Sequence, residues 1–255
     1  MLYVLAGLFV ILAIIAHLTR EKPYLDADNP YLHPEAAESL PEDMSPFIPL
    51  PAPKENMRPH RYAVVKRALD ILFSFSLLIL LSPVYLIIAA AITLDDPGPV
   101  LFSQKRVGKN KQLFMLHKFR SMKTDAPHDV PTHLLADPDQ YLTRVGRFLR
   151  NSSLDELPQI WDIFRGRMSL IGPRPALWNQ ADLVAAREKS DVNRLTPGLT
   201  GLAQVSGRDN LSIEEKAEKD AIYLRRFSLQ MDLYCFMRTI RAVLRREGVA
   251  GGNRR

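Results

Sequence analysis

Hydrophobic residues form two long runs in the first part of the chain. Residues 1–18 are apolar apart from His17, and a second apolar run covers 71–94. A helix of 18 residues rises about 27 Å, close to the roughly 30 Å hydrocarbon core of a bilayer. The first run therefore predicts a retained membrane anchor over residues 1–22. A cleaved signal peptide is the alternative, but no basic residue precedes the run and no small-residue cleavage pattern follows it.

The second run contains the dipeptide Ser82-Pro83 at its centre. Proline has no amide hydrogen and its ring clashes with the carbonyl four residues earlier, so a helix should break there. Basic residues lie on both sides of the run, at 66–67 and 105–106, which favours placing both ends in the cytoplasm. The pattern predicts a re-entrant membrane helix over 61–96, broken at Ser82 and Pro83. A kinked helix that crosses the membrane is the alternative.

Residues 23–60 are rich in proline and have neither a helical nor a strand period, so they predict an extended linker. Residues 97–255 then predict a cytoplasmic domain. Within it, 97–122 resembles a β-hairpin with a turn at 108–111. The expected fold is mixed α/β and mostly helical: a small domain with short strands on a re-entrant helix, plus the N-terminal anchor.

The last predicted helix carries an apolar stripe beside several arginines. Its apolar members are Leu233, Phe236, Met237, Ile240, Val243 and Leu244. Such a helix suits the surface of a membrane, and packing in the protein core is the alternative. Contacts through this helix would also support a homodimer, although the sequence leaves the oligomeric state open.

Composition narrows the choice of partners only slightly. The formal charge is +6 and the pI is near 9.5, which fits nucleic acid, acidic lipid headgroups or phosphorylated substrates equally well. The single cysteine, Cys235, cannot form an internal disulfide and is expected to pack against a helix.

The segment 147–175, RFLRNSSLDELPQIWDIFRGRMSLIGPRP, carries the candidate chemistry. Ser153 lies three residues before Glu156, the spacing of a capping box, and apolar residues follow with a helical period. This pattern predicts a helix that begins at Ser153 and has Asp155 and Glu156 in its first turn. Ordinary helix capping would explain these two acidic residues by itself.

Two arginines change that interpretation. Arg150 lies upstream of the acidic pair, and Arg174 lies between two prolines that restrict its backbone. A rigidly held guanidinium suits phosphate oxygens, and a carboxylate pair can bind Mg²⁺ and attack phosphorus. Together these residues predict a site for phosphoryl transfer.

Several motifs, taken in order, resemble the bacterial sugar transferases, also called monotopic phosphoglycosyl transferases, over about 66–248. They are KRALD, the Ser82-Pro83 break, DDPGPVLFSQKRVG, HKFRSMKTDA, the segment 147–175, and RLTPGLTGLAQVSGR. The resemblance implies transfer of a sugar 1-phosphate from a UDP-sugar to undecaprenyl phosphate, or another polyprenyl phosphate. It also implies Mg²⁺ as cofactor and a place in the bacterial inner membrane, with the catalytic domain on its cytoplasmic face.

The same resemblance assigns roles to single residues. Asp155 becomes the nucleophile that forms a covalent phosphosugar intermediate and releases UMP, and Glu156 helps to hold Mg²⁺. The phosphate-binding residues are Arg150, Arg174, Lys118 and Arg120. Gln204, Gly207 and Arg208 should border the nucleotide, and Asp220 and Tyr223 should lie near the site. The sugar, and the polysaccharide or glycan pathway, remain open.

Two other classes of function compete with this assignment. A non-catalytic membrane scaffold of the same fold would be favoured by loss of the acidic pair, which is present. A nucleic-acid-binding protein is disfavoured, because the arginines lie beside membrane-seeking segments.

Overall fold

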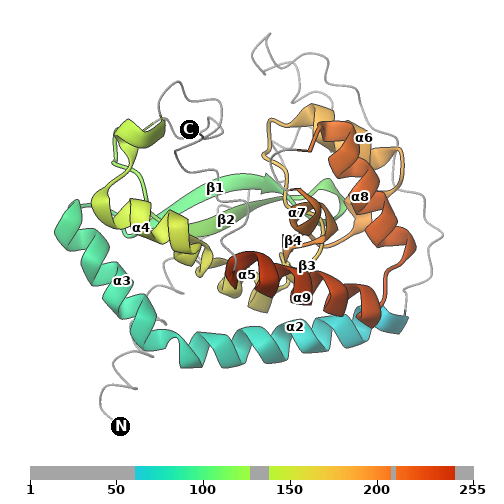
Figure 1. Ribbon diagram of the computed structural model, residues 1–255, viewed down its shortest axis with the longest axis horizontal. Helices are drawn as coiled ribbons and strands as arrows, with labels where there is room; N and C mark the ends of the chain where they lie inside the picture. The colour runs from blue at the N-terminus through green and yellow to red at the C-terminus, as the bar shows by residue number, and fades with distance from the viewer. Residues whose placement is uncertain (1–60, 127–137, 208–210, 245–255) are drawn as a thin grey trace. The chain divides into compact units, whose positions relative to one another are not determined.

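The computed structural model describes residues 61–126, 138–207 and 211–244 (Figure 1). In these ranges the chain is mostly helical with four short strands, which confirms the predicted α/β class. The predicted anchor over 1–22 and the predicted linker over 23–60 both lie outside them. Two units make up the described chain: the first comprises Phe73–Gln104 and Met115–Asp162, and the second comprises 61–72, Lys105–Phe114 and 163–244.

The second apolar run forms most of two helices, α2 (Arg61–Leu80) and α3 (Ser82–Asp95). They meet at a bend of 60°, which confirms the predicted break. Pro83 falls in the first turn of α3, where its missing N–H would have no helical partner in any case. Within the described ranges no helix alone has the length and apolar character to cross a membrane, whereas this bent pair meets both conditions together.

The first unit packs around one face of α3. Strands β1 (Leu101–Val107) and β2 (Leu113–Phe119) form a hairpin that contributes residues to both units. Helix α4 (Arg144–Ser152), a 3₁₀ turn (Leu154–Glu156) and most of α5 (Gln159–Arg165) complete the first unit. Its buried apolar residues are Leu78, Tyr85, Ile88, Ile92, Leu116, Phe119, Leu149 and Ile160. Their helical spacing in α3 explains why that helix presents one buried face.

The hairpin turn lies in the second unit and confirms the prediction for 108–111. The Gly108 N–H donates to the Gln112 carbonyl at 2.7 Å, and Lys109–Lys111 form a single 3₁₀ turn. Asn110 adopts a left-handed conformation there, which asparagine tolerates better than most residues.

The second unit is built from helices around a parallel strand pair. Strands β3 (Ser169–Ile171) and β4 (Gly198–Thr200) pair in register. The helices are α6 (Ala181–Glu188), α7 (Leu202–Ser206), α8 (Ile213–Arg225) and α9 (Leu229–Leu244). Cys235 is fully buried beside Leu202 and Tyr223, which confirms its packing role.

The apolar stripe of α9 faces outward. Leu233 and Met237 are each 57% exposed, and Phe236 and Ile240 are also exposed. For these four residues the alternative of core packing is therefore wrong. An outward apolar face beside Arg238 and Arg241 is typical of a helix that contacts a membrane or a partner.

Candidate active site

The acidic pair lies in a tight turn between α4 and α5, in the first unit. Ser153 ends α4 in a left-handed conformation, with φ of 57°, and Leu154–Glu156 form a 3₁₀ turn. The Ser153 side chain makes no capping hydrogen bond. The predicted capping box and helix start at Ser153 are therefore wrong, and α5 begins at Gln159.

Pro158 gives the physical reason for this difference. In a helix that started at Ser153, residue 158 would have to donate its amide hydrogen to the Leu154 carbonyl, and proline has none. The chain instead makes backbone hydrogen bonds that span three residues, such as the one from Leu157 N–H to the Leu154 carbonyl at 3.3 Å. The result holds Asp155, which is 8% exposed, in a compact turn rather than in a frayed helix end.

Lys118, on β2, lies against both carboxylates of the acidic pair. Its Nζ donates to Glu156 Oε1 at 2.8 Å and lies 3.9 Å from Asp155 Oδ2. One ammonium therefore offsets part of the negative charge of two adjacent carboxylates, in partly buried surroundings where charges interact more strongly than in bulk water. The structure brings together Asp155, Glu156 and Lys118, three of the predicted site residues.

Arg120 has a structural role that the sequence did not suggest. It is buried, and its Nη1 donates to Asp96 Oδ2 at 2.6 Å while its Nη2 donates to the Asp96 carbonyl. Arg120 thereby fixes the end of α3 to the end of β2. That Arg120 also binds phosphate stays a prediction.

Arg150 is oriented by its neighbours at the end of β2. Its Nε donates to Ser121 Oγ at 2.9 Å. Helix α4 can approach this point because Gly146 has no side chain: a Cβ there would lie 1.9 Å from the Ser121 carbonyl oxygen. The helix itself is capped by Thr143 and by Asp95, whose Oδ2 accepts from Val145 N–H at 2.9 Å.

In the second unit, Arg174 is presented as the sequence predicted. It is exposed between buried Pro173 and Pro175, and its carbonyl accepts a hydrogen bond from Arg187 Nη1 at 2.9 Å. Arg187 also donates from Nε and Nη2 to Asp220 Oδ2, at 2.9 and 2.7 Å. Burial raises the pKa of Asp220, and the charge of Arg187 partly opposes that rise. Asp220 thus supports the backbone of Arg174 through Arg187.

Tyr223 is almost fully buried in the second unit. Its hydroxyl donates to Asp232 Oδ1 at 2.6 Å, while Tyr62 and Lys66 donate to Asp232 Oδ2 at 2.6 and 2.5 Å. Burial, reinforced by the Asp232 carboxylate, raises the pKa of Tyr223. The pairing of Lys66 with Asp232 is not among the predictions from the sequence. A signal existed, because each is a charged residue in a largely apolar helix and a buried charge needs a partner.

Of the three residues predicted to border the nucleotide, Gln204 lies in α7 and Gly207 directly follows it. Both polar atoms of the Gln204 side chain are buried and have no hydrogen-bond partner among the described residues. Gly207 ends the helix with a φ of 155°, which favours glycine. Arg208 lies outside the described residues. Unsatisfied buried amide atoms call for a partner, so the role of Gln204 in ligand binding stays a prediction.

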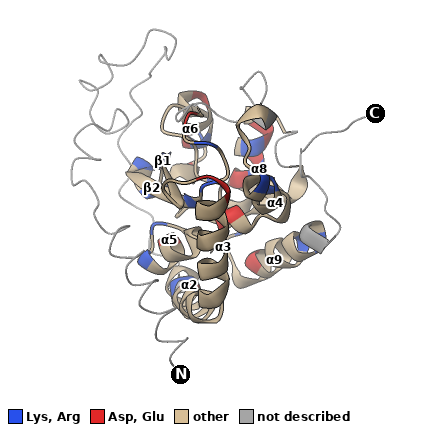
Figure 2. Cartoon of the chain, turned by 90° about the vertical axis from the view of Figure 1, so that its left-hand side faces the viewer, with Lys and Arg blue, Asp and Glu red and all other residues tan. Residues whose placement is uncertain are grey.

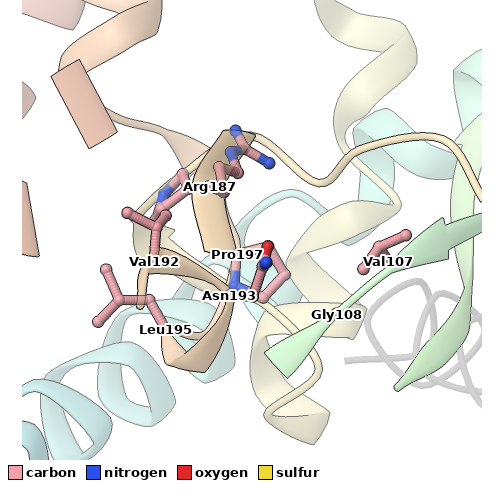
Figure 3. Close-up of a pocket in the computed structure, with 8 residues that line it drawn as sticks. Val107, Gly108, Arg187, Val192, Asn193, Leu195 and Pro197 are labelled. Atoms are coloured by element: carbon pink, nitrogen blue, oxygen red, sulfur yellow. The ribbon is translucent and has the colours of Figure 1, made fainter. Parts of the chain in front are cut away.

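A small hollow in the second unit lies beside Arg187 (Figure 3). It is lined by Val107, Gly108, Pro173, Arg187, Val192, Asn193, Leu195 and Pro197. The Asn193 amide already donates to the Val184 carbonyl and to Glu188, and Arg187 is held by Asp220. The polar side chains of this hollow therefore serve the fold.

The acidic pair offers two carboxylates to a metal ion. No group of three or more His, Cys, Asp or Glu side chains suited to a metal occurs within the described parts of the chain. Mg²⁺ in phosphoryl-transfer sites commonly uses one or two carboxylates together with substrate phosphates and water. Asp155 and Glu156 would suit Mg²⁺ in a site of that kind, with substrate phosphates supplying further oxygens, and Mg²⁺ as cofactor stays a prediction.

Comparison with known proteins identifies the class. A family model described as "Bacterial sugar transferase" matches residues 61–246. The chain belongs to this family, and the resemblance seen in its motifs is confirmed.

Individual relatives agree with this assignment. The chain is 36% identical over 210 residues to the UDP-galactose-lipid carrier transferase of Erwinia amylovora, covering 76% of this chain and 43% of the relative. It is 39% identical over 188 residues to the undecaprenyl-phosphate glucose phosphotransferase of Komagataeibacter xylinus, covering 69% and 35%. It is 36% identical over 213 residues to the exopolysaccharide production protein ExoY of Rhizobium meliloti, covering 78% and 93%. The chain therefore spans less than half of the first two relatives and nearly all of the third.

Proposed function

We propose that this protein transfers a sugar 1-phosphate from a UDP-sugar to undecaprenyl phosphate, or another polyprenyl phosphate, and so starts assembly of a polysaccharide or glycan. The observation that carries the proposal is the acidic pair Asp155 and Glu156, held in a tight turn with Lys118 Nζ at 3.9 and 2.8 Å from their respective carboxylates. Membership of the bacterial sugar transferase family supports a role for this acidic pair in sugar phosphate transfer.

In the first step, a carboxylate oxygen of Asp155 attacks the phosphorus that carries the sugar. The bond from this phosphorus to the bridging oxygen breaks, and UMP leaves with its electron pair. An acyl phosphate that links Asp155 to the sugar remains, as expected for covalent catalysis. Lys118 supports this step because its charge reduces repulsion between the acidic pair and the anionic donor.

In the second step, a phosphate oxygen of the polyprenyl phosphate attacks the same phosphorus. The bond between phosphorus and Asp155 breaks, so the carboxylate is restored and the polyprenyl diphosphosugar is released. Arg150 and Arg174 are the proposed contacts for phosphate oxygens, since a guanidinium can donate two parallel hydrogen bonds to them. Mg²⁺ held by Asp155 and Glu156 would supply further charge neutralisation at the diphosphate.

The acceptor is a lipid, so we place the reaction at the cytoplasmic face of the bacterial inner membrane. Helix α3 is uncharged until its last residue, Asp95, as Figure 2 shows, and α2 and α3 meet the length and composition of a membrane segment only as a bent pair. A re-entrant insertion of this pair would keep the acidic pair near the headgroups. The exposed apolar face of α9 offers a second contact with membrane lipid.

The alternative is a non-catalytic scaffold of the same fold in an assembly complex. To separate the two, purified protein is incubated with undecaprenyl phosphate, Mg²⁺ and a panel of UDP-sugars, and released UMP is measured. The panel should include glucose, galactose and N-acetylgalactosamine, because relatives are named for each of these sugars. We expect release with one donor.

Asp155→Asn should abolish this release, and wild-type enzyme given radiolabelled donor without acceptor should retain label that the variant does not. Asp182→Asn is a matched control, since Asp182 is an exposed acidic residue in the first turn of α6. Activity that survives Asp155→Asn would reject Asp155 as nucleophile. No release from any donor, in membranes that support another phosphoglycosyl transferase, would favour the scaffold.

A further inference from the structure

The dyad turn, Leu154–Glu156 with the following Leu157, is tied to the broken helix pair through α3. Tyr85 lies in the first turn of α3 and is 5% exposed. Its hydroxyl donates to the Leu157 carbonyl at 2.5 Å, one residue beyond Glu156. A side chain that lies directly after the Ser82-Pro83 break therefore holds the backbone that carries Asp155 and Glu156.

The Tyr85 ring is fixed independently of this hydrogen bond. It packs against Phe119 with ring centroids 5.4 Å apart, and Phe119 follows Lys118 on β2. The ring packing thus fixes the position of the Tyr85 hydroxyl. The ring also packs against β2, the strand that carries Lys118. Loss of the hydroxyl alone would leave the ring packing in place.

The far end of α3 makes two more contacts with elements of the site. Asp95 accepts from the backbone of α4, which carries Arg150, and Asp96 holds Arg120, two residues after Lys118. Helix α3 therefore contacts the dyad turn, α4 and the end of β2, and it packs against α4 (Figure 1). The 60° bend sets the direction of α3, so it also sets where these contacts fall.

We propose that Tyr85 is a positioning residue that couples the broken helix pair to the acidic pair, through its hydrogen bond to the Leu157 carbonyl. The inference rests on the proposed transferase function. It assigns to α3 a role in keeping Asp155 in line for attack as well as any role in membrane insertion. Tyr85 acts through the backbone and needs no contact with the substrate.

Tyr85→Phe tests this proposal in the full chain, reconstituted in lipid nanodiscs with undecaprenyl phosphate. Because the variant loses one hydrogen bond that orients the nucleophile, we expect kcat to fall about tenfold while KM for the donor stays within about twofold. Hydrogen–deuterium exchange of the peptide covering 154–161 should become faster in the variant, and this readout does not depend on turnover.

Tyr62→Phe is the matched control, since it also removes a tyrosine hydroxyl bonded at 2.6 Å, here to Asp232 in the second unit. It should leave both kcat and the exchange of 154–161 close to wild type. Equal losses of kcat in the two variants, or unchanged exchange of 154–161 in Tyr85→Phe, would overturn the proposal. Wild-type protein that releases no UMP would instead reject the proposed function, and the exchange measurement would still decide the role of Tyr85.

Discussion

At the scale of single residues, charges inside this protein are held in specific pairs. Lys118 lies with Glu156, Arg120 with Asp96, Lys66 with Asp232, and Arg187 with Asp220. Removing one member of a buried pair leaves an uncompensated charge, which costs more than the pair contributed. Mutation of Asp155 should therefore lower the rate of the reaction. Mutation of a residue in a supporting pair should instead lower the stability of the fold.

Arg187→Met makes this folding effect measurable. Met keeps the apolar contacts of the arginine stem but leaves Asp220 buried without its cation, so we expect a loss of about 3–5 kcal/mol in stability at neutral pH. Without Arg187 the pKa of Asp220 should rise further, since burial already raises it and Arg187 opposes the rise. A carboxyl with a raised folded-state pKa binds protons more tightly when folded, so its contribution to stability falls as pH rises through the acidic range.

The deficit of Arg187→Met relative to wild type should therefore be largest near neutrality and shrink as the pH is lowered toward about 4, where unfolded aspartate protonates. Thermal melting of both proteins across this range is the measurement. Arg225→Met, an exposed position on α8, is the control and should show neither effect. A deficit that does not change with pH would mean that Asp220 does not titrate in this range.

The same residues show what could be read from the sequence. The acidic pair, Lys118 and the Pro-Arg-Pro presentation of Arg174 were found because local spacing or family motifs mark them. The partners of Arg120 and Lys66 were missed because they lie far along the chain, and local patterns carry no information on such pairs. A chemical rule still pointed to the partner of Lys66, since Asp232 is a lone acidic residue in a largely apolar helix and a buried charge requires a partner.

At the scale of elements, two stretches with the same spacing of serine and glutamate adopt different structures. Ser153 and Glu156, and Ser212 and Glu215, both match a capping box, yet only the second pair forms it. Helix α8 continues without proline from Ser212, whereas Pro158 excludes a helix that starts at Ser153. The hairpin and the helix break were predictable because glycine, asparagine and proline determine them locally.

Substitution of Gly146 tests whether the close approach of α4 to the end of β2 is required. In Gly146→Ala, the new methyl group would lie 1.9 Å from the Ser121 carbonyl oxygen, so α4 must shift. We expect a loss of about 1–3 kcal/mol in stability, as for other overpacked sites. UMP release should fall as well, because the shift displaces Arg150 from Ser121. Arg147→Ala, at an exposed position of the same helix, is the control for melting temperature.

At the scale of the whole molecule, the proposed re-entrant insertion of α2 and α3 differs from a kinked membrane span in its topology. A re-entrant helix pair returns to the side from which it enters, whereas a kinked span would place all later residues on the other side. The bend of 60° at Leu81 and the basic residues on both flanks favour re-entry. The proposed donor, a nucleotide sugar of the cytoplasm, requires the acidic pair to be on that side.

A protease-sensitive tag fused after Arg255 tests this topology in intact spheroplasts. We expect the tag to resist external protease and to be cleaved only after the membrane is permeabilised, because the positive-inside rule keeps both flanks of the pair in the cytoplasm. Pro83→Ala provides the contrast: residue 83 regains an amide hydrogen for the Ile79 carbonyl, so a continuous helix can form and cross. Cleavage of the tag in intact spheroplasts should then rise in the variant. Cleavage of the wild-type tag in intact spheroplasts would reject re-entry and, with it, a cytoplasmic site for Asp155.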